Sequence, residues 1–268
     1  MTARRPDPGR PLRRGGARLL RSGAPLAAGA AALALWELAV RWQAIPPYIL
    51  PGPLLVLRTL VADWGILGPA LATTLATTAK ALALAVAGGV AMALLFSRSR
   101  LIAASLYPFA VVLQVTPVIA IAPLLLVWLE PGAAVLACAF LVAFFPVLSN
   151  TTAGLSAVDP GLAELFRLYG ASRWQRLLRL EAPSAAPHFF AGLRIAGGLA
   201  LIGAVAAEIA AGAAGQGSGL AWRIVEAGYR LNIPRMFAAL LLISLAGVAI
   251  HAGLSGLSWL ALRRRGGA

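Results

Sequence analysis

Long apolar runs separated by short polar connectors organise this chain. The six longest runs cover about residues 24–42, 78–96, 102–129, 133–148, 189–211 and 236–262. A hydrocarbon core of about 30 Å needs roughly 17–25 predominantly apolar residues in helical form. The pattern therefore predicts an all-α membrane protein of about six transmembrane helices.

The connectors differ in character. A proline-rich stretch at 45–53 leads into a short amphipathic piece that ends near Trp64, and the tripeptide 130–132 predicts a tight turn. Residues 159–188 carry too many charges to span a bilayer. A glycine-rich loop with a polar helix, about 212–234, precedes the last run. We thus expect a membrane domain over 24–262, flanked by basic tails at 1–23 and 263–268.

The first run follows positive charge and resembles a secretory signal. No small-residue cleavage site precedes the polar stretch 43–47, and Arg13–Arg14 is not followed by the apolar pattern of a twin-arginine signal. We therefore expect this run to be retained as the first span.

Composition excludes an ordinary soluble domain. Of 268 residues, 60% are hydrophobic and 12% charged, and the mean hydropathy is +0.84. A soluble domain carries about a quarter of its residues as charges. The bilayer is the solvent that this composition fits.

The net charge of +14 is concentrated beside the apolar runs. Basic patches with interleaved aromatic residues, which would bind nucleic acid, are absent. Short Lys/Arg-rich flanks stay in the cytoplasm, so we expect both termini inside, together with 97–101 and 153–188. One loop departs from the rule, because Arg223, Arg230 and Arg235 lie in the last external segment with only Glu226 among them.

Catalytic and metal-binding patterns are missing from the sequence. Cys138 is the only cysteine, and the two histidines, His188 and His251, are far apart. No nucleophile–base pair or metal set supports an intramembrane enzyme. There is no phosphate-binding GxxxxGK[ST] motif, and the only lysine, Lys80, lies in an apolar stretch. We expect no metal, no cofactor and no ATPase site in this chain.

Three ionisable residues lie within or near the spans, namely Glu37, Lys80 and Glu208. An intramembrane charge is costly and is a functional hypothesis by default. A proton-coupled secondary carrier would use such groups as a relay, and it remains the alternative. The chain has no convincing internal repeat, which counts mildly against an inverted-repeat carrier.

The polar segment 159–188 has the pattern of two short amphipathic helices. Asp159 and Pro160 predict an N-cap and first turn, and Gly170 predicts the turn between the helices. Ser172 is placed to cap the second helix, and we expect Pro183 to end it. A helix pair that projects from the membrane with apolar and basic faces is a docking surface.

This segment resembles the cytoplasmic loop of binding-protein-dependent ABC importer permeases. That loop reads Glu-Ala-Ala, three residues, Gly, nine residues, then Ile-x-Leu-Pro. The chain keeps Glu164, Gly170, Leu180 and Pro183 in register, and departs from the pattern at three positions, Leu165, Phe166 and Ala182. These departures resemble the nitrate, sulfonate and taurine branch.

Further stretches are similar to the same branch. They are 50–53 (Leu-Pro-Gly-Pro), 117–123 followed by Trp128, 150–160, and 192–194 (Gly-Leu-Arg). The resemblance covers roughly residues 45–262.

The resemblance implies a type I importer permease fold and a role without its own ATPase site. The loop would insert into a separate ABC ATPase subunit, which binds the ATP, through Glu164, Tyr169, Gly170, Ala171, Leu180 and Pro183. The other implied partners are an extracytoplasmic solute-binding protein and a second permease copy, in the bacterial inner membrane. The implied substrates are small anions such as sulfonates, taurine or nitrate, or a vitamin precursor.

Gate residues are expected on the third and fifth runs, which flank the docking loop. Pro117 and Pro123 remove backbone hydrogen bonds and kink a helix where it lines a cavity. Glu208 lies near the end of the fifth run, where the branch often carries glutamate. Gly197, Gly198 and Gly203 on that run, and Gly88 and Gly89 on the second, would allow close helix approach.

Overall fold

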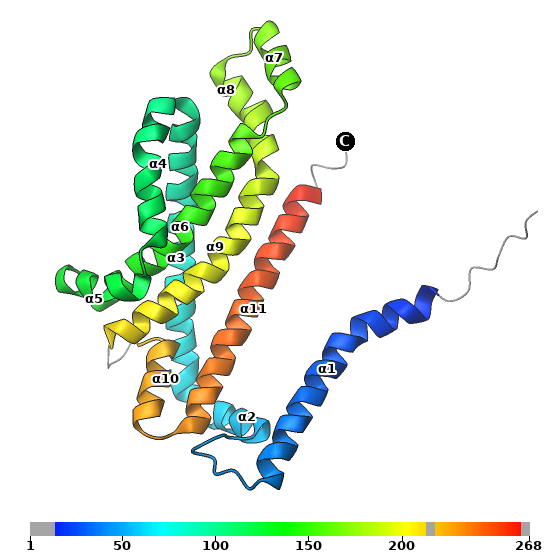
Figure 1. Ribbon diagram of the computed structural model, residues 1–268, viewed down its shortest axis with the longest axis vertical. Coiled ribbons are helices and arrows are strands. Elements are labelled where there is room, and N and C mark those ends of the chain that lie inside the picture. The colour runs from blue at the N-terminus through cyan, green and yellow to red at the C-terminus, as the bar shows by residue number, and fades with distance from the viewer. Residues whose placement is uncertain (1–13, 213–217, 264–268) are drawn as a thin grey trace, which may run out of the picture.

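The computed structural model describes residues 14–212 and 218–263, and their side chains from residue 24 onward. This part of the chain is helical and contains no strand (Figure 1). The helices are α1 (Arg14–Trp42), α2 (Pro53–Ala62), α3 (Trp64–Arg98), α4 (Arg100–Val115), α5 (Val118–Trp128), α6 (Pro131–Ser156), α7 (Pro160–Leu168), α8 (Arg173–Arg176), the π-helix η1 (Leu177–Glu181), α9 (Ala182–Ala211), α10 (Leu220–Tyr229) and α11 (Ile233–Arg263).

Helices α3, α6 and α9 form the centre of the bundle. Their contact surfaces are mostly alanine, with fully buried Ala85, Ala143 and Ala200 in one cluster. A Cβ at Gly203 would lie 3.0 Å from the Cα of Ala139, so α6 and α9 approach backbone to backbone there. Small residues permit this approach in a bilayer, where apolar side chains gain nothing by leaving lipid.

The glycine expectations are confirmed in part. A Cβ at Gly89 would meet Val147 at 2.9 Å, and one at Gly197 would overlap Leu254. Gly88 is at ordinary contact distance from Phe144, whereas Gly198 faces open space. The prediction of close approach is therefore wrong for Gly198.

Five helices are long and apolar enough to cross a membrane, and α4 with α5 passes only as a pair bent by 101°. The prediction that proline kinks or breaks the third span is confirmed at Pro117. The break falls at Pro117, which lacks an N–H, and Thr116 before it is extended (φ −73°, ψ 125°) as a residue preceding proline prefers. Pro108 and Pro123 lie inside α4 and α5 without ending them.

Helix α3 begins at Trp64, well before the expected start at residue 78. The polar threonines in between do not interrupt it. The hydroxyls of Thr73 and Thr78 donate to the carbonyls of Pro69 and Thr74, one turn earlier in the same helix. Polar groups satisfied in this way are compatible with a continuous helix.

The expectation that Pro183 ends the second short helix is wrong. Helix α8 continues through η1 into α9, so Pro183 lies inside a continuous helix and its missing N–H leaves one intrahelical hydrogen bond unmade. The π-helix immediately before it widens the backbone by one residue per turn. This widening relieves the clash that a proline ring makes with the carbonyl four residues earlier.

Helix α1 stands away from the bundle (Figure 1). It begins at Arg14 rather than at residue 24, and Leu26 and Leu35 on it are 78% and 66% exposed. Its described contacts are near its C-terminal end, where Trp36 lies 6.0 Å from the ring of Phe237 on α11. The Glu37 carboxylate there accepts a hydrogen bond from the Leu54 amide and caps α2.

The molecule has two distinct ends. The α3–α4 turn, the pair α7–α8 and the end of α11 lie at one end, and α2 and α10 lie at the other (Figure 1). The segments 97–101 and 159–188, grouped together by their basic charge, thus share one end of the fold.

Candidate functional site

Helix α7 is held by its own N-terminal residues. The Asp159 carboxylate accepts hydrogen bonds from the amides of Gly161 (2.7 Å) and Leu162 (3.2 Å), and Pro160 occupies the first turn. These bonds satisfy amides that a short helix leaves without partners. The predicted cap is confirmed.

Gly170 and Ser172 set the angle between α7 and α8. Gly170 has a φ of +66°, a left-handed conformation that favours glycine. The Ser172 hydroxyl accepts from the Gln175 amide, and the Gln175 side chain accepts from the Ser172 amide, which completes a capping box. Both turn predictions are confirmed, and α8 starts where the sequence indicates.

The helix pair is anchored to the bundle by contacts with α3 and α6. Leu177 is buried in a cluster with Phe96, Leu148 and Leu155, which belong to the ends of α3 and α6. The guanidinium of Arg98 at the end of α3 lies 5.4 Å from the centre of the Trp174 ring. The segment is therefore seated on α3 and α6 while its outer face stays free.

The outer face of this pair is apolar and exposed. None of the residues of α7 is buried, and Leu168, Tyr169 and Trp174 are 79%, 83% and 70% exposed. A groove of about 300 Å³ lies between the two helices, lined by Leu165, Phe166, Tyr169, Ala171, Gln175 and Arg179. Apolar side chains presented beside arginines suit a protein partner.

The predicted coupling residues take three different places. Tyr169 and Ala171 line the groove, and Gly170 is the turn between them. Glu164 is exposed on α7 and makes no hydrogen bond or ion pair within the described residues. Leu180 is buried beneath the pair, whereas Pro183 is exposed at the start of α9.

The predicted gate residues lie away from this groove. Pro117 forms the break between α4 and α5, and Pro123 lies within α5. A second, apolar groove of about 330 Å³ runs between α5, α9 and α11; Ile119, Leu201, Val205, Ile209 and Ile243 are among its lining residues.

Glu208 is buried at the end of α9, with 6% of the residue exposed. One carboxylate oxygen accepts from the Thr74 hydroxyl of α3 at 2.8 Å, and the other accepts from the Ala221 amide of α10 at 3.0 Å. The Thr74 oxygen in turn accepts from the Leu220 amide at 2.9 Å. We call these four residues, Glu208, Thr74, Leu220 and Ala221, the carboxylate node.

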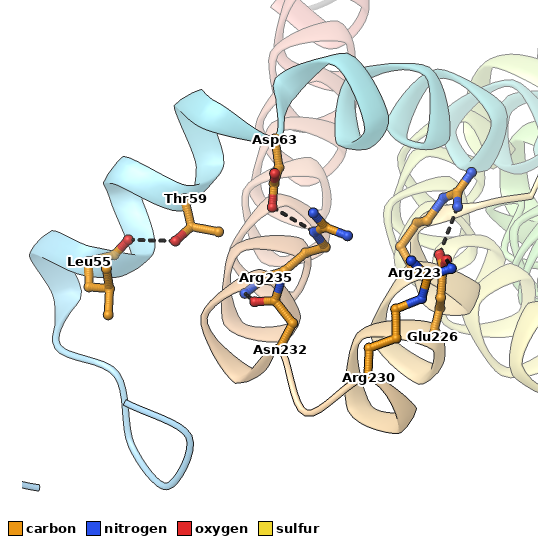
Figure 2. Close-up of polar contacts among 8 residues, drawn as sticks. All are labelled: Leu55, Thr59, Asp63, Arg223, Glu226, Arg230, Asn232 and Arg235. Carbon is orange, nitrogen blue, oxygen red and sulfur yellow. Dashed lines mark hydrogen bonds and ion pairs between the residues drawn. The ribbon is translucent and has the colours of Figure 1, made fainter. Parts of the chain in front are cut away.

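Each of the three arginines that depart from the charge rule forms an ion pair. Figure 2 shows Arg235 directed at Asp63, 2.6 Å away, and Arg223 directed at Glu226, 2.7 Å away. Arg230 pairs with the same Glu226 at 2.9 Å. The hydrogen bond from Arg223, aided by the nearby charges, lowers the pKa of Glu226 below its usual range. The three arginines share two carboxylates, and because the charge rule counts arginines whether or not acids accompany them, the departure of this loop from the rule stands.

Two partners in these contacts escaped sequence reasoning. Thr74 lies 134 residues from Glu208 along the chain, and Asp63 lies 172 residues from Arg235. The one available signal was the unbalanced charge of Arg223, Arg230 and Arg235, which called for acidic partners. Among the described residues no group of three His, Cys, Asp or Glu side chains is placed to hold a metal ion.

The comparisons with known proteins agree with this architecture. Residues 85–257 match the family described as binding-protein-dependent transport system inner membrane component. A probable ABC transporter permease protein of Haemophilus influenzae is 35% identical over 79% of this chain and 85% of its own length. A formylaminopyrimidine transport permease of Halalkalibacterium halodurans is 34% identical over 81% and 85%.

More distant relatives include a putative aliphatic sulfonates transport permease of Bacillus subtilis, 26% identical over 80% of this chain and 78% of its own length. A nitrate import permease of Synechococcus elongatus is 28% identical over 62% and 60%. A crystal structure of an amino acid ABC transporter with histidines has the same fold, with a TM-score of 0.61 over 77% of this chain and 97% of that one at 20% identity. The chain belongs to the inner-membrane components of binding-protein-dependent transport systems, the permease subunits of ABC importers.

Proposed function

We propose that this permease is driven by a separate ABC ATPase that docks on α7 and α8. The observation that carries the proposal is the exposed apolar groove between these helices, capped at both N-termini and seated on the ends of α3 and α6. An element whose apolar side chains find no cover in its own chain is suited to a protein partner. Family membership favours this arrangement over a proton-coupled secondary carrier.

The coupling residues then have separate roles. Tyr169 and Ala171 contact the ATPase directly from the groove, and Glu164 offers a carboxylate at its side. Gly170 holds the two helices at their angle. Leu180 and Pro183 connect the pair to α9, so that ATP-driven movement of α7 and α8 reaches the membrane span without a flexible joint.

The translocation path runs between this chain and a second permease copy, with α5 and α9 lining it. The groove between α5, α9 and α11 supports this placement, because it is apolar, open and adjacent to the break at Pro117. Pro117 and Pro123 keep α5 short and sharply inclined to α4, and Glu208 lies at the end of α9 near the same region. An extracytoplasmic binding protein delivers solute at the opposite end from α7 and α8, where α2 and α10 lie, and access alternates between the two ends.

The orientation follows from the basic segments. We place α7, α8 and both termini in the cytoplasm of a bacterium, since the short arginine-rich flanks are retained there. Arg223, Arg230 and Arg235 near α10 depart from this rule, and we assign the two ends on the larger number of arginines at the α7–α8 end.

For the substrate, we propose a small heterocyclic vitamin precursor as the first solute to test. The formylaminopyrimidine relative (34% identical) and a riboflavin permease of Chloroflexus aurantiacus (33%) are nearer in sequence than the sulfonate relative (26%) and the nitrate relatives (27–30%). The α5–α9 groove is apolar and has no arginine or lysine in its lining, which suits a neutral ring better than an anion. Sulfonates, taurine and nitrate are the competing class.

Uptake measurements in proteoliposomes test both statements. The permease with its ATPase and binding protein should accumulate a labelled pyrimidine precursor only when ATP is supplied to the ATPase side. Accumulation of taurine or nitrate, and not of the pyrimidine, would reverse the substrate choice. Accumulation driven by a proton gradient without ATP would restore the carrier alternative.

A further inference from the structure

The carboxylate of Glu208 is buried without a basic partner. No lysine or arginine within the described residues forms an ion pair with it. A buried carboxylate is costly unless hydrogen bonds replace its water. Among its hydrogen-bond donors are the Thr74 hydroxyl of α3 and the Ala221 amide of α10.

One of these donors, the Ala221 amide, lies at the start of α10. Gly219, the residue before the helix, has no side chain to cap it, so the first amides lack a local acceptor. Ala221 donates directly to Glu208, and Leu220 donates to Thr74, whose hydroxyl donates to Glu208. A residue of α9 and a residue of α3 together do the work of an N-cap, and a negative charge is favourable at that end of a helix.

The contact between Glu208 and the start of α10 requires a glycine at position 219. A Cβ at this position would overlap the Glu208 carboxylate. The absence of a side chain lets the carboxylate reach the amides beyond it. Beside it, a small cavity of about 70 Å³ is lined by Thr73, Thr77 and Trp222 among others.

Packing and the carboxylate node together hold α10. Leu220 is fully buried in a cluster with Leu67 and Leu242, and Ile224 packs against the same cluster. The helix has ten residues, a length at which an isolated helix is marginal, so its position depends on these contacts and on the hydrogen bonds at its N-terminus.

We propose that Glu208 is a positioning residue that fastens α10 to α3 and α9, so that a displacement of α10 on binding-protein docking is transmitted to α9. The second half of this statement rests on the proposed function, which places the binding protein at the α10 end. The first half concerns the chain alone. Ala227, 1% exposed on α10 and outside the node, reports whether α10 has left the bundle.

The experiment measures thiol labelling of an A227C reporter. It uses the complete importer in nanodiscs, which expose both membrane faces, with the buried Cys138 replaced by serine. Glu208→Ala and Thr74→Val should each raise the labelling rate by a maleimide at least about tenfold. Thr73→Val is the matched control, because Thr73 lines the same cavity but donates within its own helix. It should leave the rate unchanged.

ATP hydrolysis stimulated by the binding protein is measured on the same samples. Glu208→Ala should reduce the stimulation together with the loss of protection at A227C. Unchanged labelling in Glu208→Ala and Thr74→Val would overturn the fastening role. Faster labelling with normal stimulation would overturn the transmitting role. An unstimulated parent complex would instead count against the proposed function, while labelling would still decide the fastening role.

Discussion

The two ends of the helix bundle differ in how their charged side chains are bonded, although both ends expose apolar side chains, such as Tyr229 (84%) and Leu231 (75%) at the α10 end. At the α7–α8 end, Leu168, Tyr169 and Trp174 are more than two-thirds exposed, and Glu164 has no partner within the described residues. At the α10 end, Arg223, Arg230 and Arg235 are all paired, and the Glu208 carboxylate is buried and hydrogen-bonded.

This difference distinguishes α7, which is free to bind a partner, from α10, which is bonded to other helices of its own chain. Helix α7 satisfies its backbone locally, through Asp159, and leaves its apolar face free. Helix α10 receives its cap from two other helices. A helix that binds another protein must be rigid and must keep its binding face free of contacts with its own chain. A helix that transmits movement must be bonded to the helices that it moves.

The largest effect is expected from the turn of the docking pair. Gly170→Val should lower uptake by about tenfold or more. A β-branched L-residue at this positive φ is strained by about 1–2 kcal/mol, which would change the angle between α7 and α8. Gly170→Asn is the matched control, since asparagine tolerates this conformation and a side chain meets nothing within 4 Å. Initial uptake rates at equal membrane levels measure both. Equal uptake rates for the two variants would contradict the claim that uptake depends on the left-handed conformation at position 170.

The Asp63–Arg235 pair tests the fastened end. Both side chains are less than one-fifth exposed and lie 2.6 Å apart, so Asp63→Asn should cost about 1.5–3 kcal/mol, the range for hydrogen bonds to charged groups. Thermal unfolding of the purified permease, in a cycle with Arg235→Ala, measures the coupling. Arg41→Ala breaks an exposed pair with Glu37 and should cost no more than about 0.5 kcal/mol. Similar costs for both pairs would contradict the comparison.

The capping box of α8 should have a smaller effect. Ser172→Ala removes the hydroxyl that accepts from the Gln175 amide, and losing such a cap costs about 1 kcal/mol. Faster amide hydrogen exchange at Arg173–Arg176 would show the loss. Ser156→Ala is the control, because its hydroxyl donates only to the Thr152 carbonyl in its own helix. Unchanged exchange in Ser172→Ala would show that η1 and α9 alone stabilise α8.

The smallest effect is expected from Glu226. Its folded pKa is lowered, so the stabilisation from its two arginines is present above the unfolded pKa of about 4.3 and is lost as the pH falls through the lower folded pKa. The loss should be no more than about 1 kcal/mol, since Arg230 is two-thirds exposed. Glu226→Gln should remove this part of the pH dependence of unfolding below about pH 4.3. An unchanged pH profile in this variant would show that other carboxylates cause it.

Local features were predictable from sequence. The caps by Asp159 and Ser172 and the turn at Gly170 depend on residues within a few positions of one another. Span positions followed from apolar runs because the bilayer imposes a length. The branch resemblance, confirmed by the family match, added the type of protein.

Features that the apolar pattern does not show were not predictable. Helix α3 extends to Trp64 with the Thr73 and Thr78 hydroxyls bonded within it, and a π-helix joins α8 to α9 beside Pro183. Pro117 was recognised as a breaker, but the 101° bend follows from packing of α5 on α6 and α9. Glu208 was singled out as a buried charge, while its partner Thr74 lies 134 residues away.

The claim that α7 and α8 carry the ATPase is tested most directly by affinity purification. The tagged chain is extracted from its host in mild detergent, in parallel with a Leu168→Glu variant that places a charge on the exposed apolar face without touching the buried core. The account predicts that the parent chain recovers an ATPase subunit, and that the variant, at equal membrane levels, recovers little or none. Recovery of the ATPase at the same stoichiometry with both chains would contradict it.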